Sequence, residues 1–138
     1  MGAKSDRYPF VKELVVMDAH ALAYADASFD CAVGQFVITL VANPERVLSE
    51  CARVVRPGGQ IILVNHLYSE RGLAAAVERL LAQKARSFGL RPEFPFQRLA
   101  DWALTHGSTE LIERRKLRPF GVYTLVRFRR AEAQSAAA

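Results

Sequence analysis

The fold of this chain can be read most directly from residues 15–67, VVMDAHALAYADASFDCAVGQFVITLVANPERVLSECARVVRPGGQIILVNHL. Three apolar runs alternate here with polar turns. The run over residues 14–17 is short and rich in β-branched side chains, which predicts a strand buried on both faces. The run over 30–40 is almost wholly apolar, as in a parallel strand that helices cover on both sides. The run over 60–66 ends in polar residues and predicts a third strand.

A helix is predicted between the second and third strands. Asn43 is a favourable N-cap, and Pro44 suits the first helical position because its missing N–H would have no partner there. The apolar residues that follow repeat with helical spacing and would share one face: Val47, Leu48, Cys51, Val54 and Val55. The sequence Arg-Pro-Gly-Gly over 56–59 is expected to end the helix and turn the chain back. A strand–helix–strand order of this kind predicts a right-handed crossover and parallel pairing.

The second half of the chain predicts two helices followed by two strands. A helix is expected over 69–88, and a shorter one over 96–106 that Gly107 closes. The two final strands are expected over 110–116 and 121–129, as an antiparallel pair.

Composition supports a single domain. With 138 residues, of which 51% are apolar, the chain can form one core, which we expect over 13–130 between a frayed entry (1–12) and a disordered tail (131–138). Cys31 and Cys51 lie within apolar segments, which favours buried free thiols over a disulfide or a metal site. No run approaches the ~18 apolar residues that span a bilayer, and the N-terminus lacks a signal-peptide pattern, so a cytoplasmic protein is expected.

Positive charge gathers towards the C-terminus. The formal net charge is +5, and arginines and lysines cluster over 113–118 and 127–130. A solvated strand edge explains such clusters most often, whereas attraction to phosphate or to an anionic membrane surface is the functional alternative. No nucleic-acid recognition motif accompanies the charge, so nucleic acid is not an expected partner.

Candidate site residues lie where the predicted strands end, because ligands bind at the carboxyl ends of the strands in an open α/β sheet. This rule selects Asp18, residues 35–39, Asn65 and His66. A lone Asp after a strand can equally be a turn former or a ligand acceptor. A polar amide such as Gln35 within an apolar strand needs a buried partner. Phe36 is either core or part of a ligand site.

The order of these motifs resembles the class I, Rossmann-like S-adenosylmethionine-dependent methyltransferases. The segments QFVITLVANPE, RPGG and VNHL carry the general resemblance, and LRPEFPFQRL (90–99) with RRKLRPFGVYTLVRF (114–128) is similar to the bacterial phosphatidylethanolamine N-methyltransferases. The implied fold class is α/β, with only the C-terminal part of the methyltransferase sheet: parallel strands plus a terminal antiparallel pair. The implied cofactor is S-adenosylmethionine.

The resemblance also implies roles for particular residues. Asp18 would accept a hydrogen bond from the adenine amino group, with the backbone of Ala19 and His20 at the ring edge. Gln35 and Phe36 would line the sulfonium side of the cofactor. The expected substrate-binding residues are Asn65, His66, Arg115 and Arg118 for the headgroup, and Tyr123 for an apolar mouth.

His66 is also the predicted catalytic residue. An amine acceptor arrives as an ammonium and must lose a proton before it can attack a methyl group, and a histidine with a pKa of ~6.5 can take that proton. The alternative is a histidine that only makes structural hydrogen bonds.

A Gly-rich turn for the methionine end of the cofactor does not occur before Asp18, so roughly 60 residues of the usual sheet lack a counterpart. The strand over 30–40 would then be an exposed apolar edge that favours a homo-oligomer or a complementing chain. Three functions remain open: methylation of phosphatidylethanolamine by a truncated enzyme, a non-catalytic remnant that binds membrane or protein, and methylation of a small molecule. The expected location is cytoplasmic, or peripheral at the inner membrane surface, where the phospholipid partner lies.

Overall fold

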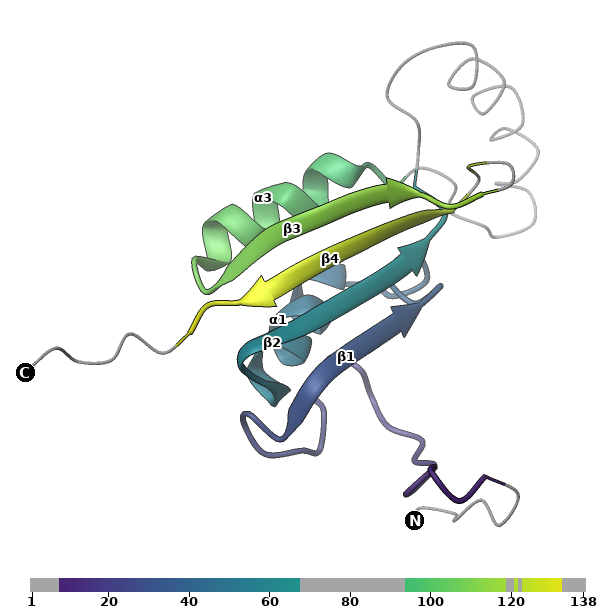
Figure 1. Ribbon diagram of the computed structural model, residues 1–138, viewed down its shortest axis with the longest axis vertical. Helices are drawn as coiled ribbons and strands as arrows, with labels where there is room; N and C mark the ends of the chain where they lie inside the picture. The colour runs from purple at the N-terminus through teal and green to yellow at the C-terminus, as the bar shows by residue number, and fades with distance from the viewer. Residues whose placement is uncertain (1–7, 68–93, 119–120, 122, 133–138) are drawn as a thin grey trace, which may run out of the picture.

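The computed structural model describes residues 8–67, 94–118, 121 and 123–132. They form one four-stranded sheet with the strand order β1-β2-β4-β3 (Figure 1). The elements, in chain order, are β1 (Phe29–Gln35), α1 (Pro44–Val54), β2 (Val55–Asn65), α3 (Phe96–His106), β3 (Thr109–Lys116) and β4 (Thr124–Arg130). β1 and β2 are parallel, and β4 runs antiparallel to both of its neighbours. The predicted α/β class, with parallel strands and a terminal antiparallel pair, is confirmed.

Both α1 and α3 cover the same face of the sheet (Figure 1). The core between the layers consists of alternate strand residues and the inner helix faces. Its most deeply buried side chains, all at most 1% exposed, include Leu48, Ile61, Leu63, Leu99, Val126 and Phe128. Trp102 of α3 packs edge-on against Phe128, with the ring centroids 5.5 Å apart.

The opposite face of the sheet is not covered by any helix among the described residues (Figure 1). Val33 on β1 is 61% exposed, and Cys31 beside it is exposed as well. The prediction that helices cover both faces of the strand over 30–40 was therefore wrong. The expected burial of Cys31 was wrong as well. Cys51 on α1 is half-buried, and burial raises the pKa of its thiol to about 11. Both thiols are free, as predicted.

β1 is shorter than the predicted strand over 30–40. It ends at Gln35 because Phe36 adopts a left-handed backbone conformation with φ 56°, which breaks the extended geometry. The chain then turns inward and places Ile38, 1% exposed, in the core. Among the described strands β1 pairs only with β2, so it lies at the edge of the sheet, as expected.

Residues 14–17 do not form the predicted buried strand. Leu14 makes an isolated bridge, Leu14 and Val16 are 58% and 101% exposed, and no described strand runs beside them. A strand needs a neighbouring ladder to satisfy its backbone and an opposing surface to bury its side chains. The apolar sequence alone supplies neither.

The start of α1 is as predicted, and its end is not. The Asn43 side chain accepts a hydrogen bond from the Arg46 N–H at 3.0 Å, and Pro44 occupies the first turn. Residues 56–59 are not a turn after the helix, because β2 begins at Val55 directly after α1. The register between β1 and β2 shifts here, and a Cβ on Gly59 would lie 2.6 Å from the Asp30 carbonyl oxygen. The missing side chain therefore lets the two strands come together.

The C-terminal elements agree closely with the sequence. α3 has the predicted bounds, and Gly107, with φ 70°, closes it by donating its N–H to the Ala103 carbonyl at 3.3 Å. β4 begins three residues later than predicted because Gly121 (φ 62°) and Tyr123 belong to the turn. The helix predicted over 69–88 lies outside the described residues, as does the tail from 133 onward. No described helix is both long and apolar enough to cross a bilayer.

Candidate functional site

The carboxyl ends of β1 and β2 lie at the same end of the sheet as the end of β3 and the start of β4 (Figure 1). This end brings together most of the predicted site residues. Phe36 follows β1, Asn65 ends β2 opposite Thr124 of β4, and Tyr123 directly precedes Thr124. Segment 18–20 reaches the same end because it contacts the first turn of α1, which follows β1. The structure thus gathers residues that are far apart in sequence.

Asp18 forms a tight turn with His20. Its Oδ1 accepts the His20 backbone N–H at 2.9 Å and lies 2.8 Å from the His20 ring Nδ1. The backbone hydrogen bond and then the ring hydrogen bond from His20 hold the pKa of Asp18 below its ordinary value. The carboxylate is therefore an acceptor at neutral pH, and its side chain is 68% exposed. The turn-forming role is observed, and the exposed carboxylate is compatible with binding an adenine amino group.

His20 connects this turn to α1. Its Nε2 accepts the Asn43 backbone N–H at 3.3 Å, and its carbonyl accepts the Arg46 Nε–H at 3.0 Å. These contacts assign the ring proton to Nδ1, which faces Asp18. The His20 N–H already bonds to Asp18 and is therefore not open to a ligand.

A half-buried ion pair between Arg53 and Glu50 on α1 holds the segment that follows the Asp18 turn. Arg53 donates from Nη2 to the Leu22 carbonyl at 2.9 Å and from Nη1 to the Tyr24 carbonyl at 2.8 Å. Glu50, 8% exposed, accepts the Leu22 N–H at 2.8 Å. Sequence reasoning missed both residues. Their spacing of three on a helix was the available signal, because it places them on one face.

Gln35 and Phe36 are both exposed, although the apolar strand around them predicted burial. Gln35 is exposed on the uncovered face, so its amide needs no buried partner and that expectation was wrong. Phe36 is 47% exposed, so it is not core. Its ring packs against that of Tyr123, with centroids 5.2 Å apart and planes inclined by 66°.

Asn65 is 1% exposed, and its buried side-chain Oδ1 has no hydrogen-bond partner among the described residues. Buried amide oxygens are nearly always paired, so this oxygen is an exception at the end of β2. His66 follows directly and is half-buried. The structure therefore keeps both predicted substrate residues at this end of the sheet.

The two arginines predicted to bind phosphate, Arg115 and Arg118, lie in different surroundings. Arg115 lies on β3 with its Nε 3.1 Å from Glu113 Oε1, so its charge is partly offset. Arg127 lies 3.0 Å from the other carboxylate oxygen of Glu113, without hydrogen-bond alignment. Arg118 is exposed in the turn after β3, close in sequence to Tyr123.

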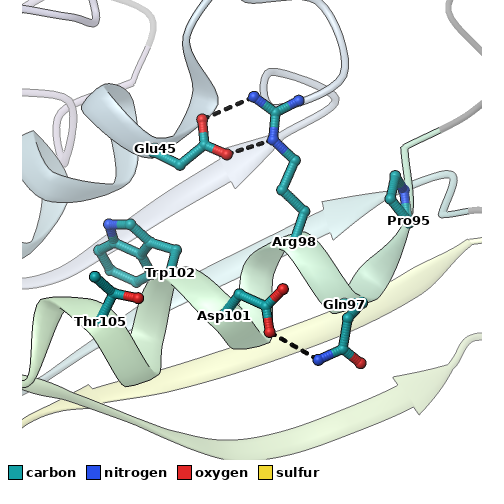
Figure 2. Close-up of a pocket in the computed structure, with 7 residues that line it drawn as sticks. All are labelled: Glu45, Pro95, Gln97, Arg98, Asp101, Trp102 and Thr105. Carbon is teal, nitrogen blue, oxygen red and sulfur yellow. Dashed lines mark hydrogen bonds and ion pairs between the residues drawn. The ribbon is translucent and has the colours of Figure 1, made fainter.

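A hollow of about 620 Å³ lies elsewhere, between the start of α1 and the outer side of α3 (Figure 2). Arg98 Nη2 donates to Glu45 Oε2 at 2.8 Å, and Gln97 donates to Asp101 at 2.8 Å. The Arg98 hydrogen bond is the main reason that the pKa of Glu45 is lowered. These polar groups satisfy one another, so the hollow offers little to a ligand. No group of acidic, histidine or cysteine side chains among the described residues could hold a metal ion.

Comparison with known proteins agrees with this architecture. Residues 2–63 match the family profile described as a methyltransferase domain. The chain is 41% identical over 121 residues to the phosphatidylethanolamine N-methyltransferase of Cereibacter sphaeroides, covering 87% of this chain and 57% of that protein. The chain thus spans little more than half the length of this relative.

Solved structures share the fold. A methyltransferase from Bacillus halodurans superposes with a TM-score of 0.64 at 16% identity, covering 85% of this chain and 70% of that one. A SAM-dependent methyltransferase from Thermotoga maritima gives 0.60 at 19% identity, covering 81% of this chain and 61% of the other. Sequence and fold together place this chain with the methyltransferases, on a Rossmann-like sheet.

Proposed function

We propose that this chain supplies the carboxyl-terminal half of a site that methylates the amine of phosphatidylethanolamine. The observation that carries the proposal is the 41% identity to the Cereibacter enzyme, which extends over 121 residues and so takes in the C-terminal half. Lipid headgroup recognition is expected from that half, because the more general family profile matches only residues 2–63.

The described residues fit the adenine end of the cofactor. Asp18 presents an ionised, largely exposed carboxylate, which suits the adenine amino group, and the backbone of Ala19 would lie at the ring edge. Gln35 and Phe36 would lie towards the sulfonium. When bound, S-adenosylmethionine supplies an electrophilic methyl group. The Gly-rich turn for its methionine end has no counterpart among the described residues, so the chain alone holds only part of the expected site.

The substrate end provides proton transfer and charge. The acceptor nitrogen becomes a nucleophile when its ammonium gives a proton to the His66 ring, and positioning of that nitrogen supplies much of the remaining rate. Arg115 and Arg118 would bind the phosphate, with Arg118 the more available of the two.

The first test is titration calorimetry of the purified chain with S-adenosylhomocysteine. Saturable binding that Asp18→Ala weakens about tenfold, and that Asp101→Ala on the outer side of α3 leaves unchanged, would support the adenine assignment. Methyl transfer from labelled S-adenosylmethionine to phosphatidylethanolamine vesicles, compared with small amines in solution, then identifies the acceptor. Transfer only to small amines would replace the lipid by a small-molecule substrate.

A second function, a non-catalytic interaction module, is favoured by the uncovered sheet face. The edge strand β1 and the exposed Val33 offer backbone and apolar surface to a second copy or to a complementing chain. A folded chain that binds no S-adenosylhomocysteine but associates through β1 would support this function instead. Peripheral binding to an anionic membrane through the C-terminal cations belongs to either function, and vesicle co-sedimentation tests it.

A further inference from the structure

Two aromatic rings meet at the ligand end of the sheet and remain open to solvent. Phe36 and Tyr123 come from positions 87 residues apart in the chain (123 − 36), yet their ring centroids lie 5.2 Å apart. They are 47% and 44% exposed. Core packing does not explain a pair that is half in solvent, so the rings are available to a ligand.

The backbone at Phe36 is held in a conformation that non-glycine residues rarely adopt. Its φ is 56°, and its N–H donates to the Val64 carbonyl of β2 at 2.9 Å, which fixes the turn. Strain of this kind tends to be retained at binding sites, where it places a side chain that a relaxed backbone would not. Here it places the ring next to Tyr123.

The chemistry of the pair favours a cation. Inclined aromatic rings present electron-rich faces, and ammonium groups carrying methyl substituents bind such faces through cation–π attraction and apolar contact. Each methyl group on the nitrogen replaces an N–H donor with apolar surface, so a fully methylated ammonium depends on ring contacts rather than on hydrogen bonds.

We propose that Phe36 and Tyr123 form a subsite for the methylated ammonium of a phosphocholine-type headgroup, with Arg118, exposed in the turn after β3, as the partner of its phosphate. This assignment rests on the proposed function and adds to it, because it selects acceptors by the methylation state of the nitrogen. The bound group can belong to a free phosphocholine or to a lipid.

The test measures binding of the full chain to phosphocholine and to phosphoethanolamine by calorimetry, without cofactor. We expect phosphocholine to bind about threefold to tenfold more tightly. Tyr123→Leu and Phe36→Leu remove a π face while they keep apolar bulk, and each should erase most of that preference. Tyr123→Phe should keep it. Phe10→Leu is a matched control, because Phe10 is 79% exposed and pairs with Tyr8 at 5.8 Å elsewhere in the chain.

Equal affinities for the two headgroups in the unmodified chain would overturn the subsite, whatever the variants do. So would a Tyr123→Leu protein that melts normally and keeps the preference. Vesicles of phosphatidylcholine distinguish a lipid from a free ligand, since only a lipid subsite makes vesicle binding sensitive to Tyr123→Leu. If the chain prefers phosphocholine but transfers no methyl group, the subsite is supported and the proposed enzymatic function is rejected. If it transfers methyl groups without that preference, the enzymatic function is supported and the subsite is rejected.

Discussion

Arg53 and Glu50, one helical turn apart on α1, form a two-point ion pair in which Nε lies 2.9 Å from Oε1 and Nη2 lies 2.9 Å from Oε2. The same guanidinium also binds the Leu22 and Tyr24 carbonyls. The pair therefore fastens the segment after the Asp18 turn to the helix layer. Through this ion pair, the packing of α1 helps to determine the position of Asp18, the residue predicted to bind adenine.

Arg53→Lys should loosen this segment, because an ammonium cannot reproduce the forked contacts. We expect a lower free energy of unfolding, measured with urea, and faster amide hydrogen exchange at Leu22 and Ala27, whose N–H groups bond to Glu50 and to the Arg53 carbonyl. Arg56→Lys is the control, since that exposed pair with Asp30 should contribute less than about 1 kcal/mol. Equal effects of the two substitutions would contradict the role given to Arg53.

Glu50 should make stability depend on pH. The Arg53 hydrogen bond is the main reason that its folded-state pKa lies below the ordinary value of 4.5, and burial only partly opposes it. The unfolded chain therefore takes up the proton first as the pH falls. The stabilisation is complete above about pH 4.5 and is lost as the pH drops through the lower folded-state pKa. Urea unfolding of the unmodified chain and Glu50→Gln should differ at pH 6 and converge towards pH 3, and a constant difference would refute this linkage.

Gly59→Ala should destabilise the junction between β1 and β2. The new Cβ would meet the Asp30 carbonyl oxygen at 2.6 Å and Val55 Cγ1 at 2.5 Å, and the backbone oxygen cannot turn aside. A loss of about 1–3 kcal/mol is expected in denaturant unfolding. Gly34→Ala is the matched substitution in β1, where the Cβ would meet only the flexible end of Leu63 at 3.0 Å. If Gly34→Ala proved the more costly of the two, the close approach at Gly59 would not be the reason for the glycine.

The sequence predicted best the elements whose stabilising groups are local. α3 and the start of α1 are fixed by a glycine with positive φ, an N-cap and a helical apolar period, all within a few residues. The site was predicted less well, because burial depends on what packs across the sheet. Gln35 reads as buried in its apolar strand, yet it is exposed, while the positive φ of Phe36 and the unpaired Asn65 oxygen have no local signature.

Val33 provides a test of the open sheet edge. It is 61% exposed on β1, whose outer backbone has no neighbour among the described strands. An exposed apolar edge of this kind pairs readily with another chain, and a charge placed on it opposes pairing. In sedimentation velocity experiments, Val33→Lys should shift a self-associating chain towards the monomer without lowering its cooperative melt. Leu104→Lys, at an 81% exposed position on α3, adds the same charge away from the edge and should leave association unchanged. If both substitutions shift the chain towards the monomer equally, the added charge rather than its position on β1 controls association.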